Sequence, residues 1–291
     1  MDGHPAGATE ALAALRDERD RDVVAATRFP ATLATLQREL GQLGIAPRIT
    51  LLVHSSLARL GFVAGGAQSV VVALLEAVGP AGTLVMPTHS GGLTKPARWQ
   101  RPSVPAEWWP IIEAETPPFD PALTPTRRMG AIVECFRHVT DVRRSHHPSV
   151  SFAACGPNAA SITDGHELAY GLGEGSPLAR LYELDAWVLL LGVGHPNNTS
   201  LHLAEYRSNY PGKQWITQAS PVLVDGQRRW VEYPDLDGDA SDFEALGEDF
   251  ARSGQERRGQ VGTGAARLMR QRVLVDFAAS WFEATRTERH P

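Results

Sequence analysis

WVLLLGVGHPNNTSLHLAEYRSNY, residues 187–210, is the stretch that decides the fold. Its first half, up to Leu191, is an unbroken apolar run, which is typical of a strand buried on both faces of a sheet. Residues 195–198 all favour turns, and Thr199 or Ser200 can then cap a helix. The stretch therefore predicts a central strand, and a helix that begins at the carboxyl end of that strand.

Two polar residues of this helix, His202 and Glu205, are three positions apart and therefore share one face. In open α/β sheets, ligands bind at the carboxyl ends of the strands, where His202 would lie. The helix macrodipole disfavours imidazolium there, whereas Glu205 raises the pKa of His202 and can orient its ring. A neutral, oriented imidazole beside a crevice is a candidate general base. The alternative is a polar pair that ties the helix to a loop.

The composition is that of an ordinary soluble enzyme. The 291 residues are 43% hydrophobic and 21% charged, which suffices for one large domain or two small ones. The net charge of −5 predicts no general affinity for nucleic acid. Two cysteines imply no disulfide framework and favour a reducing, cytoplasmic location. We expect no signal peptide, because the N-terminus carries acids without an apolar run, and no membrane span, because no apolar run is long enough.

A second apolar strand, predicted over 49–53, runs into the His-Ser-Ser sequence at 54–56. A strongly apolar helix over 67–78 and a strand over 82–86 follow, so this part of the chain should be a β-α-β unit with parallel strands. Residues 54–56 should therefore lie at the same edge of the sheet as His202. The predicted fold class is α/β, with a largely parallel central sheet flanked by helices.

The long segment 87–125 is rich in Pro, Thr, Gly and Trp and shows no sustained period. So long an irregular insertion inside a compact domain is usually functional. It ends just before a helix predicted over 129–138. Two threonine hydroxyls, Arg127 and Arg128 precede that helix and form a candidate anion site. The alternative is a basic surface loop.

Two adjacent histidines, His146 and His147, invite a metal-binding interpretation. Side chains at successive positions diverge, however, and no His-x-x-x-His pair or cysteine cluster supports them, so we expect no metal. Cys135, in a predicted helix, and Cys155, in a predicted strand, should be packing residues and not nucleophiles.

The C-terminal part predicts a β-rich, acidic segment. Residues 214–224 and 228–233 resemble a hairpin around an Asp-Gly pair. Residues 232–249 carry eight acids and no Lys or Arg. This acidic segment is either a solvated face or a surface that attracts a polycation. The remainder, 261–283, should hold one strand and a closing helix.

Several separated motifs resemble the aminoglycoside 3-N-acetyltransferase family. They are Val53-His54-Ser55-Ser56-Leu57, Phe119-Asp120-Pro121 through Met129-Gly130, Gly173-Glu174-Gly175-Ser176-Pro177-Leu178, and Leu190-Leu191-Gly192-Val193-Gly194 through Asn198-Thr199-Ser200-Leu201-His202-Leu203-Ala204-Glu205. Asp242-Phe243-Glu244, Gly247, Phe250 and Val261-Gly262 also follow the order of the family. The resemblance covers residues 31–285, which we expect to form a single domain, and leaves 1–30 as an N-terminal extension.

The resemblance implies an enzyme that transfers the acetyl group of acetyl-CoA to an amine at the 3-N position of a deoxystreptamine aminoglycoside, which inactivates the antibiotic. It places the general base on His202 with Glu205 beside it, and direct transfer needs neither an enzyme nucleophile nor a metal. His54 is the rival base, because it also lies at the end of a strand. The residues expected to bind acetyl-CoA are His54, Ser55, Ser56, Leu57, Thr124, Thr126, Arg127 and Met129.

The acidic segment suits a polycationic acceptor, and Glu205, Asp242 and Glu244 are the predicted acceptor contacts. Members of the family also acetylate other amines, and the long insertion is where the acceptor pocket should vary. Two other classes stay open: a metal-dependent hydrolase built on the histidines named above with Glu205, and a non-catalytic drug-binding protein that uses the acidic segment alone. A homodimer is compatible with the sequence.

Overall fold

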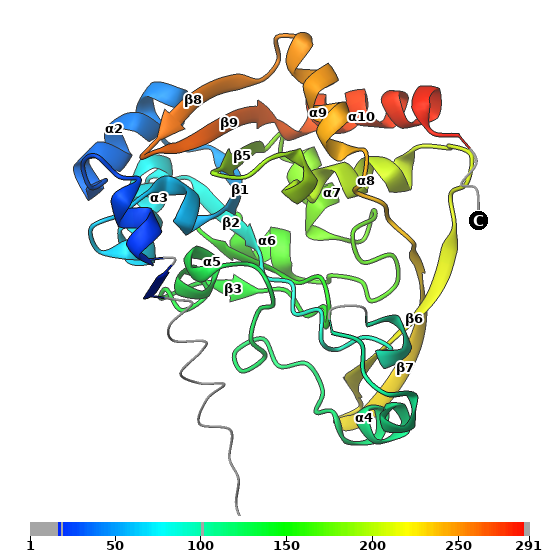
Figure 1. Cartoon of the computed structure of the whole chain (residues 1–291). Helices are drawn as coiled ribbons and strands as arrows, with labels where there is room; N and C mark the ends of the chain where they lie inside the picture. The colour runs from blue at the N-terminus through cyan, green and yellow to red at the C-terminus, as the bar shows by residue number, and fades with distance from the viewer. Residues whose placement is uncertain (1–16, 19, 100–101, 288–291) are drawn as a thin grey trace, which may run out of the picture.

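The computed structural model describes residues 17–18, 20–99 and 102–287 of the chain (Figure 1). The described part holds a seven-stranded sheet, helices on both of its faces and a separate two-stranded ribbon. The fold class is therefore α/β, as predicted. Most of the predicted N-terminal extension, 1–16, lies outside the described residues, and 20–25 are helical. No described helix is both long and apolar enough to cross a membrane.

The seven-stranded sheet has the order β3-β4-β2-β1-β5-β9-β8. Its strands are β1 (Thr50–Ser55), β2 (Thr83–Pro87), β3 (Arg143–Arg144), β4 (Phe152–Cys155), β5 (Trp187–Leu191), β8 (Arg257–Val261) and β9 (Gly264–Arg270). Among the described strands, β1 pairs in parallel with β2 and β5, and every other pair in this sheet is antiparallel. The prediction of a largely parallel sheet was wrong, because only the three central strands pair in parallel and the other four pairings are antiparallel.

The connections explain the directions of the strands. Helix α3 (Gly66–Val78) returns the chain from the end of β1 to the start of β2, as a β-α-β unit requires. After the insertion and α5, the chain forms β3 and then turns back over residues 145–151 into β4, which is therefore antiparallel to β3 and to β2. A tight turn, in which Gly262 has a φ of 58°, joins β8 to β9. The strand and closing helix predicted over 261–283 match β9 and α10, whereas β8, which precedes them and completes the hairpin, was not predicted.

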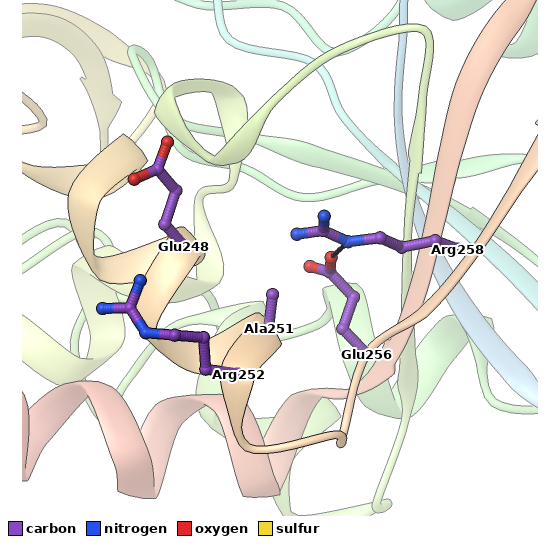
Figure 2. Close-up of a pocket in the computed structure, with 5 residues that line it drawn as sticks. All are labelled: Glu248, Ala251, Arg252, Glu256 and Arg258. Atoms are coloured by element: carbon purple, nitrogen blue, oxygen red, sulfur yellow. Dashed lines mark hydrogen bonds and ion pairs between the residues drawn. The ribbon is translucent and has the colours of Figure 1, made fainter.

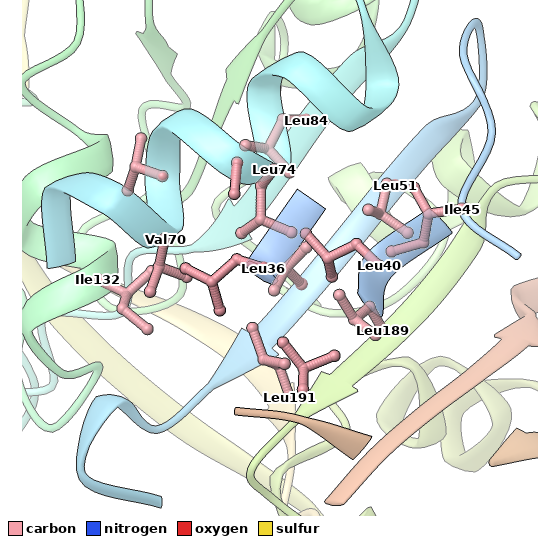
Figure 3. Close-up of a cluster of buried hydrophobic side chains, with 14 of the residues drawn as sticks. Leu36, Leu40, Ile45, Leu51, Val70, Leu74, Leu84, Ile132, Leu189 and Leu191 are labelled. Atoms are coloured by element: carbon pink, nitrogen blue, oxygen red, sulfur yellow. The ribbon is translucent and has the colours of Figure 1, made fainter. Parts of the chain in front are cut away.

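Both faces of the sheet are buried, as the apolar runs of the central strands predict. Leu51 and Leu189 pack into one core, whereas Leu52 and Val188 pack into the other, because successive side chains alternate across a strand. The first core is covered by α2 (Leu33–Leu43), α3 and α5 (Ala131–Phe136) (Figure 3). The second core is covered by α6 (Ala159–Thr163), α7 (Pro177–Glu183), α8 (Ser200–Arg207), α9 (Phe243–Arg252) and α10 (Gln271–Thr285).

The separate ribbon consists of β6 (Trp215–Val224) and β7 (Gln227–Leu236), which matches the predicted hairpin. The insertion is less irregular than predicted. It contains the 3-10 turns η2 (Pro96–Arg98) and η3 (Ala106–Trp108) and the short helix α4 (Trp109–Glu115). Helix α4 lies against the far end of the ribbon (Figure 1). There the Arg228 guanidinium donates to the carbonyl oxygens of Glu113 and Thr116.

Candidate active site

Three histidines lie at the carboxyl edge of the central strands. His54 is near the end of β1, His89 follows β2, and His202 lies in the first turn of α8, which follows β5. The register of β1 and β5 pairs His54 with Leu190. The structure thus places His54 and His202 at one edge, as the strand order predicts. His89 was not predicted as a site residue, because it belongs to the start of the irregular insertion. Its position just after a buried strand nevertheless indicates that it lies at the same edge of the sheet.

The turn between β5 and α8 sets the start of the helix that carries His202. The Asn198 side-chain oxygen accepts the backbone N–H of Ser200 at 3.2 Å. Thr199 is the N-cap residue, but its side chain makes no capping hydrogen bond, so the predicted hydroxyl cap is replaced by the Asn198 amide. The Thr199 hydroxyl instead lies 3.4 Å from Nε2 of His54 and connects the two strand ends.

His202 and Glu205 form a direct pair. Nδ1 of His202 lies 2.5 Å from Oε2 of Glu205, whose side chain is completely buried, while 24% of the His202 side chain is exposed. Burial acts to raise the pKa of Glu205, but its hydrogen bonds to His202 and other donors outweigh burial and lower that pKa below its usual range. The ionised carboxylate can only accept, so in the neutral ring Nδ1 is the nitrogen that carries the proton and Nε2 the one with the lone pair. This is the tautomer that a general base requires.

The second carboxylate oxygen of Glu205 is also held. Oε1 accepts the backbone N–H of Asp239 at 2.9 Å and Nη1 of Arg286 at 2.6 Å. The backbone of Gly238 covers the pair closely, because a Cβ atom there would lie 3.1 Å from both Oε2 of Glu205 and Nδ1 of His202. The orientation of the imidazole is therefore fixed from the loop before α9 and from the end of α10.

The two acids predicted to contact the acceptor differ in their surroundings. Asp242 accepts two hydrogen bonds from the Arg286 guanidinium, both at 2.8 Å. Glu244 is exposed in the first turn of α9, and its Oε2 lies beside Gly194. The charge of Asp242 therefore acts on the surroundings of Glu205, whereas Glu244 faces solvent.

Basic side chains from other parts of the chain neutralise part of the acidic segment. Lys95 lies 2.6 Å from Glu232, and Arg98 lies 3.8 Å from Asp237. Both basic residues belong to the insertion, so a sequence window over the acidic segment alone overstates its net negative charge. These partly exposed pairs also connect the insertion to β7 and the loop after it, although such pairs contribute little stability.

The two segments predicted to bind acetyl-CoA come together at the same edge. A Cβ atom on Gly130 would lie 3.9 Å from the carbonyl oxygen of Ser55, so the end of β1 faces the start of α5. The hydroxyl oxygen of Ser55 is buried and forms no hydrogen bond within the described part of the chain. Ser56 precedes the 3-10 turn η1 (Leu57–Leu60). Leu57 and Met129 pack against the first core.

The threonines of the second segment bond within the protein. Thr126 donates its backbone N–H to the Glu134 carboxylate at 2.8 Å and its hydroxyl to the same oxygen. The Thr124 hydroxyl accepts a backbone N–H at 2.9 Å. The backbone N–H of Arg127 donates to the carbonyl oxygen of His89 at 2.8 Å, which places this segment beside the end of β2. The hydroxyl part of the predicted anion site is thus already engaged by the protein.

Four buried or half-buried histidines, His54, His89, His147 and His166, have a lowered pKa and are neutral near pH 7. Burial, helped by the nearby His202, lowers the pKa of His54 to about 3. Burial, helped by nearby basic groups such as His54, lowers the pKa of His89 to about 3. Burial lowers the pKa of His147 to about 4, although its hydrogen bond to a backbone carbonyl acts in the opposite direction. A histidine in an unfolded chain has a pKa of about 6.5.

We expect the protein to lose stability as the pH falls from about 6.5 towards 4. Below the unfolded pKa of about 6.5, unfolding takes up a proton at each of these four positions, whereas the folded rings stay neutral. Each position therefore lowers the free energy of unfolding by up to about 1.4 kcal/mol per pH unit. Urea denaturation at about pH 7, 6 and 5 measures this slope.

The control for this prediction is His89→Leu. Nε2 of His89 is buried and forms no hydrogen bond within the described residues, so an apolar side chain removes the titrating group without leaving a partner unpaired. The free energy of unfolding of this variant should fall less steeply with decreasing pH, by about the contribution of one histidine. A wild-type free energy of unfolding that stays constant between about pH 7 and 5 would contradict the neutral state of these rings.

The adjacent histidines His146 and His147 do not form a metal site within the described residues. Nδ1 of His147 accepts the backbone N–H of Val150 at 3.0 Å, and its Nε2 bonds the carbonyl oxygen of Leu168 at 3.1 Å. His146 is exposed. Among the described residues, no group of three or more His, Cys, Asp or Glu side chains is placed to hold a metal ion. The hydrolase alternative therefore has no donor set in this part of the chain.

A surface pocket of about 420 Å³ is formed by other residues (Figure 2). It is lined by Glu248, Ala251, Arg252, Glu256 and Arg258. Its connection to the site is indirect: the buried Glu256 lies 2.7 Å from Nε2 of His195, in the 3-10 turn η4 (His195–Asn197) before α8. The predicted base His202 and its rival His54 lie at the carboxyl ends of the central strands, and neither lines this pocket.

Comparison with known proteins identifies the family. The chain matches the model of the aminoglycoside 3-N-acetyltransferase family over residues 52–283. The chain belongs to this family. It is 42% identical over 263 residues to the SPbeta prophage-derived aminoglycoside N(3')-acetyltransferase-like protein YokD of Bacillus subtilis, and the match covers 90% of this chain and 96% of YokD. The crystal structure of YokD has a TM-score of 0.89 at 41% identity, covering 91% of this chain and 98% of YokD.

Two further solved structures are similar to this chain. AAC-IIIb in a binary complex with CoASH has a TM-score of 0.78 at 30% identity, covering 90% of this chain and all 100% of AAC-IIIb. AAC-VIa bound to sisomicin has a TM-score of 0.77 at 32% identity, covering 88% of this chain and 98% of AAC-VIa. These comparisons confirm the family that the sequence motifs indicate.

Proposed function

We propose that this protein transfers the acetyl group of acetyl-CoA to the 3-N amine of an aminoglycoside, with residues 31–285 acting as one domain. The proposal is carried by the His202–Glu205 pair, which lies at the carboxyl edge of the central strands in a member of this family. The similar structures support both substrates, since AAC-IIIb was solved with CoASH and AAC-VIa with sisomicin.

His202 is the proposed general base. An aminoglycoside amine is mostly protonated at neutral pH, so a base must remove its proton before or during the attack on a thioester. Nε2 of His202 keeps its lone pair because Nδ1 is bonded to Glu205, and the ring is partly exposed. His54 is a poorer candidate, since burial lowers its pKa to about 3 and so makes its ring a weak base at neutral pH.

The residues at the ends of β1 and β2 fit the proposed cosubstrate. Acetyl-CoA supplies an acyl thioester, whose carbonyl oxygen gains negative charge during amine attack. The buried Ser55 hydroxyl, which has no hydrogen-bond partner within the described residues, suits a donor to such an oxygen. Leu57 and Met129 offer apolar surface beside it, and Arg127 offers a cation for a phosphate group.

The acceptor side of the proposal differs from the sequence prediction in one respect. Glu205 is completely buried and Asp242 is bonded to Arg286, so both act on His202 and not directly on the acceptor. Glu244 is exposed and keeps its proposed role of attracting a cationic amine. The insertion and the β6–β7 ribbon are the proposed source of acceptor selectivity, because they are joined to each other beyond the central sheet.

We expect purified protein to release CoA thiol from acetyl-CoA only when an aminoglycoside is present. Ellman's reagent measures the thiol across a panel of aminoglycosides, and NMR of the product locates the new acetyl group. Release should persist after treatment with a chelator, because the proposed base and donors belong to the chain. Aminoglycoside binding without thiol release would favour the drug-binding alternative, and activity that returns only with added zinc would favour the hydrolase.

A further inference from the structure

We propose that Arg286 is the positioning residue of the His202–Glu205 pair, so that the orientation and basicity of the imidazole depend on the end of α10. Arg286 directly follows α10 and reaches the buried carboxylate of Glu205 from the side opposite to His202. This inference rests on the proposed function, in which His202 is the general base. Its role in setting the pKa of His202 can nevertheless be measured without any turnover.

The guanidinium of Arg286 is held by several contacts at once. It donates to Glu205 at 2.6 Å, to both oxygens of Asp242 at 2.8 Å and to the carbonyl oxygen of Asp239 at 2.7 Å. Its carbon centre lies 3.8 Å from the centroid of the Phe282 ring. Only 9% of the side chain is exposed. A planar, nearly buried guanidinium with this many partners has one orientation, which makes it a rigid support for the Glu205 carboxylate.

The two carboxylate oxygens of Glu205 have different hydrogen-bond partners. Oε2 accepts from His202, and Oε1 accepts from Arg286 and the backbone N–H of Asp239. Without the Arg286 contact, the terminal torsion of Glu205 loses its strongest restraint, and Oε2 can leave the position that orients the imidazole. A carboxylate that must hold a ring at hydrogen-bond distance needs such support to stay in place.

Arg286 also sets the charge around the imidazole. Its positive charge offsets the negative charges of Glu205 and Asp242, and burial of Glu205 makes their interactions strong. The other charged or titratable groups around the pair are Lys213, Asp235, Asp239, His54 and His89. Removing the Arg286 charge makes the potential at His202 more negative, which favours imidazolium. The pKa of His202 should therefore rise in a variant that lacks this cation.

The test compares Arg286→Met and Arg286→Lys with the wild type. Arg286→Met should lower kcat by about 10–100-fold, the usual span for losing a supporting partner, with little change in the KM for acetyl-CoA. The acidic-limb pKa of its rate profile should shift upwards. Arg286→Lys keeps the charge but not the forked contacts, so it should restore the acidic-limb pKa and only part of kcat.

Two controls separate this role from a purely structural one. Arg252→Met removes an exposed arginine that pairs with Asp249 on α9, and it should leave kcat and the pH profile unchanged. In the Glu205→Gln background, Arg286→Met should have a much smaller effect than in the wild type, because its partner carboxylate is already gone. Full additivity of the two substitutions, or a folded Arg286→Met enzyme with wild-type kcat and acidic-limb pKa, would overturn the proposal.

NMR titration keeps the test independent of turnover. The imidazole signal of His202, assigned by its loss in His202→Gln, should titrate at a higher pH in Arg286→Met than in the wild type. An inactive wild type with this NMR shift would reject the proposed function and keep the Arg286–Glu205–His202 linkage. An active wild type without the shift would keep the proposed function and reject the linkage.

If Arg286→Met does not fold, the same titration is made on Arg286→Lys and Asp242→Asn. Asp242→Asn removes a negative charge and should therefore lower the pKa of His202. An unchanged pKa of His202 in this variant would overturn the proposal.

Discussion

His202→Ala should bind acetyl-CoA about as well as the wild type but turn over about 10²–10⁴-fold more slowly. The substitution removes the lone pair on Nε2 that we propose takes the proton of the amine. It leaves the end of β1 and the segment 124–129 untouched, so binding of the cosubstrate should persist. Thiol release measures the turnover, and calorimetric titration with CoA measures the affinity.

Related substitutions sharpen this result. His202→Gln keeps hydrogen bonds but has no titrating nitrogen, so it should be almost as slow as His202→Ala. Glu205→Gln should lie between these variants and the wild type, and it should lower the acidic-limb pKa, because it removes a negative charge that favours imidazolium. His138→Ala, an exposed histidine just after α5, should behave as the wild type. Near-normal turnover of His202→Ala, beside an inactive but folded His54→Ala, would move the base to His54.

Gly156→Ala should destabilise the protein by roughly 3–5 kcal/mol, the sum of backbone strain and overpacking. Gly156 follows β4 with a φ of 125°, which side chains rarely allow. A Cβ atom there would lie 2.2 Å from the carbonyl oxygen of Gly82 and 2.8 Å from Cα of Thr83. These are backbone atoms at the start of β2, so no flexible side chain can move aside. Chemical denaturation or thermal melting measures the loss.

Two other glycines separate the sources of this loss. Gly226, in the turn of the ribbon, has a φ of 74° but no atom within 4 Å of a built Cβ, so Gly226→Ala should show the strain alone, about 1–2 kcal/mol. Gly41 lies inside α2 with open space around it, and Gly41→Ala should stabilise by about 0.5–1 kcal/mol. A Gly156→Ala protein as stable as Gly226→Ala would show that β2 and β4 can separate at low cost.

The centre of the fold could be predicted because its burial follows the local pattern of the sequence. The apolar runs of β1 and β5 supply both cores, and the glycines after α2 and α3 end those helices. The directions of β4 and β9 could not be predicted, because each is the second strand of a short hairpin whose first strand, β3 or β8, the sequence pattern does not reveal. Strand β8 was missed because its first four residues are exposed, so it lacks an apolar alternation.

The candidate site could be predicted where its residues are close in the sequence. His202 and Glu205 share one turn of α8, and a spacing argument finds them. Arg286 lies 81 positions beyond Glu205 and 44 beyond Asp242, so no local pattern reveals the contact. The sequence therefore suggested that Asp242 was available to a substrate. Whether a carboxylate in an acidic segment is available to a ligand depends on partners that are distant in the sequence, and the local sequence does not show them.

Substitutions in the insertion should leave much of its attachment to the β6–β7 ribbon intact. Arg228 recognises the carbonyl oxygens of Glu113 and Thr116, and the backbone N–H of Phe119 donates to the carbonyl oxygen of Pro221. Main-chain acceptors are present whatever side chain a position carries. Side chains along α4 can therefore change while the insertion keeps its place, and α8, which carries His202, is not part of this junction.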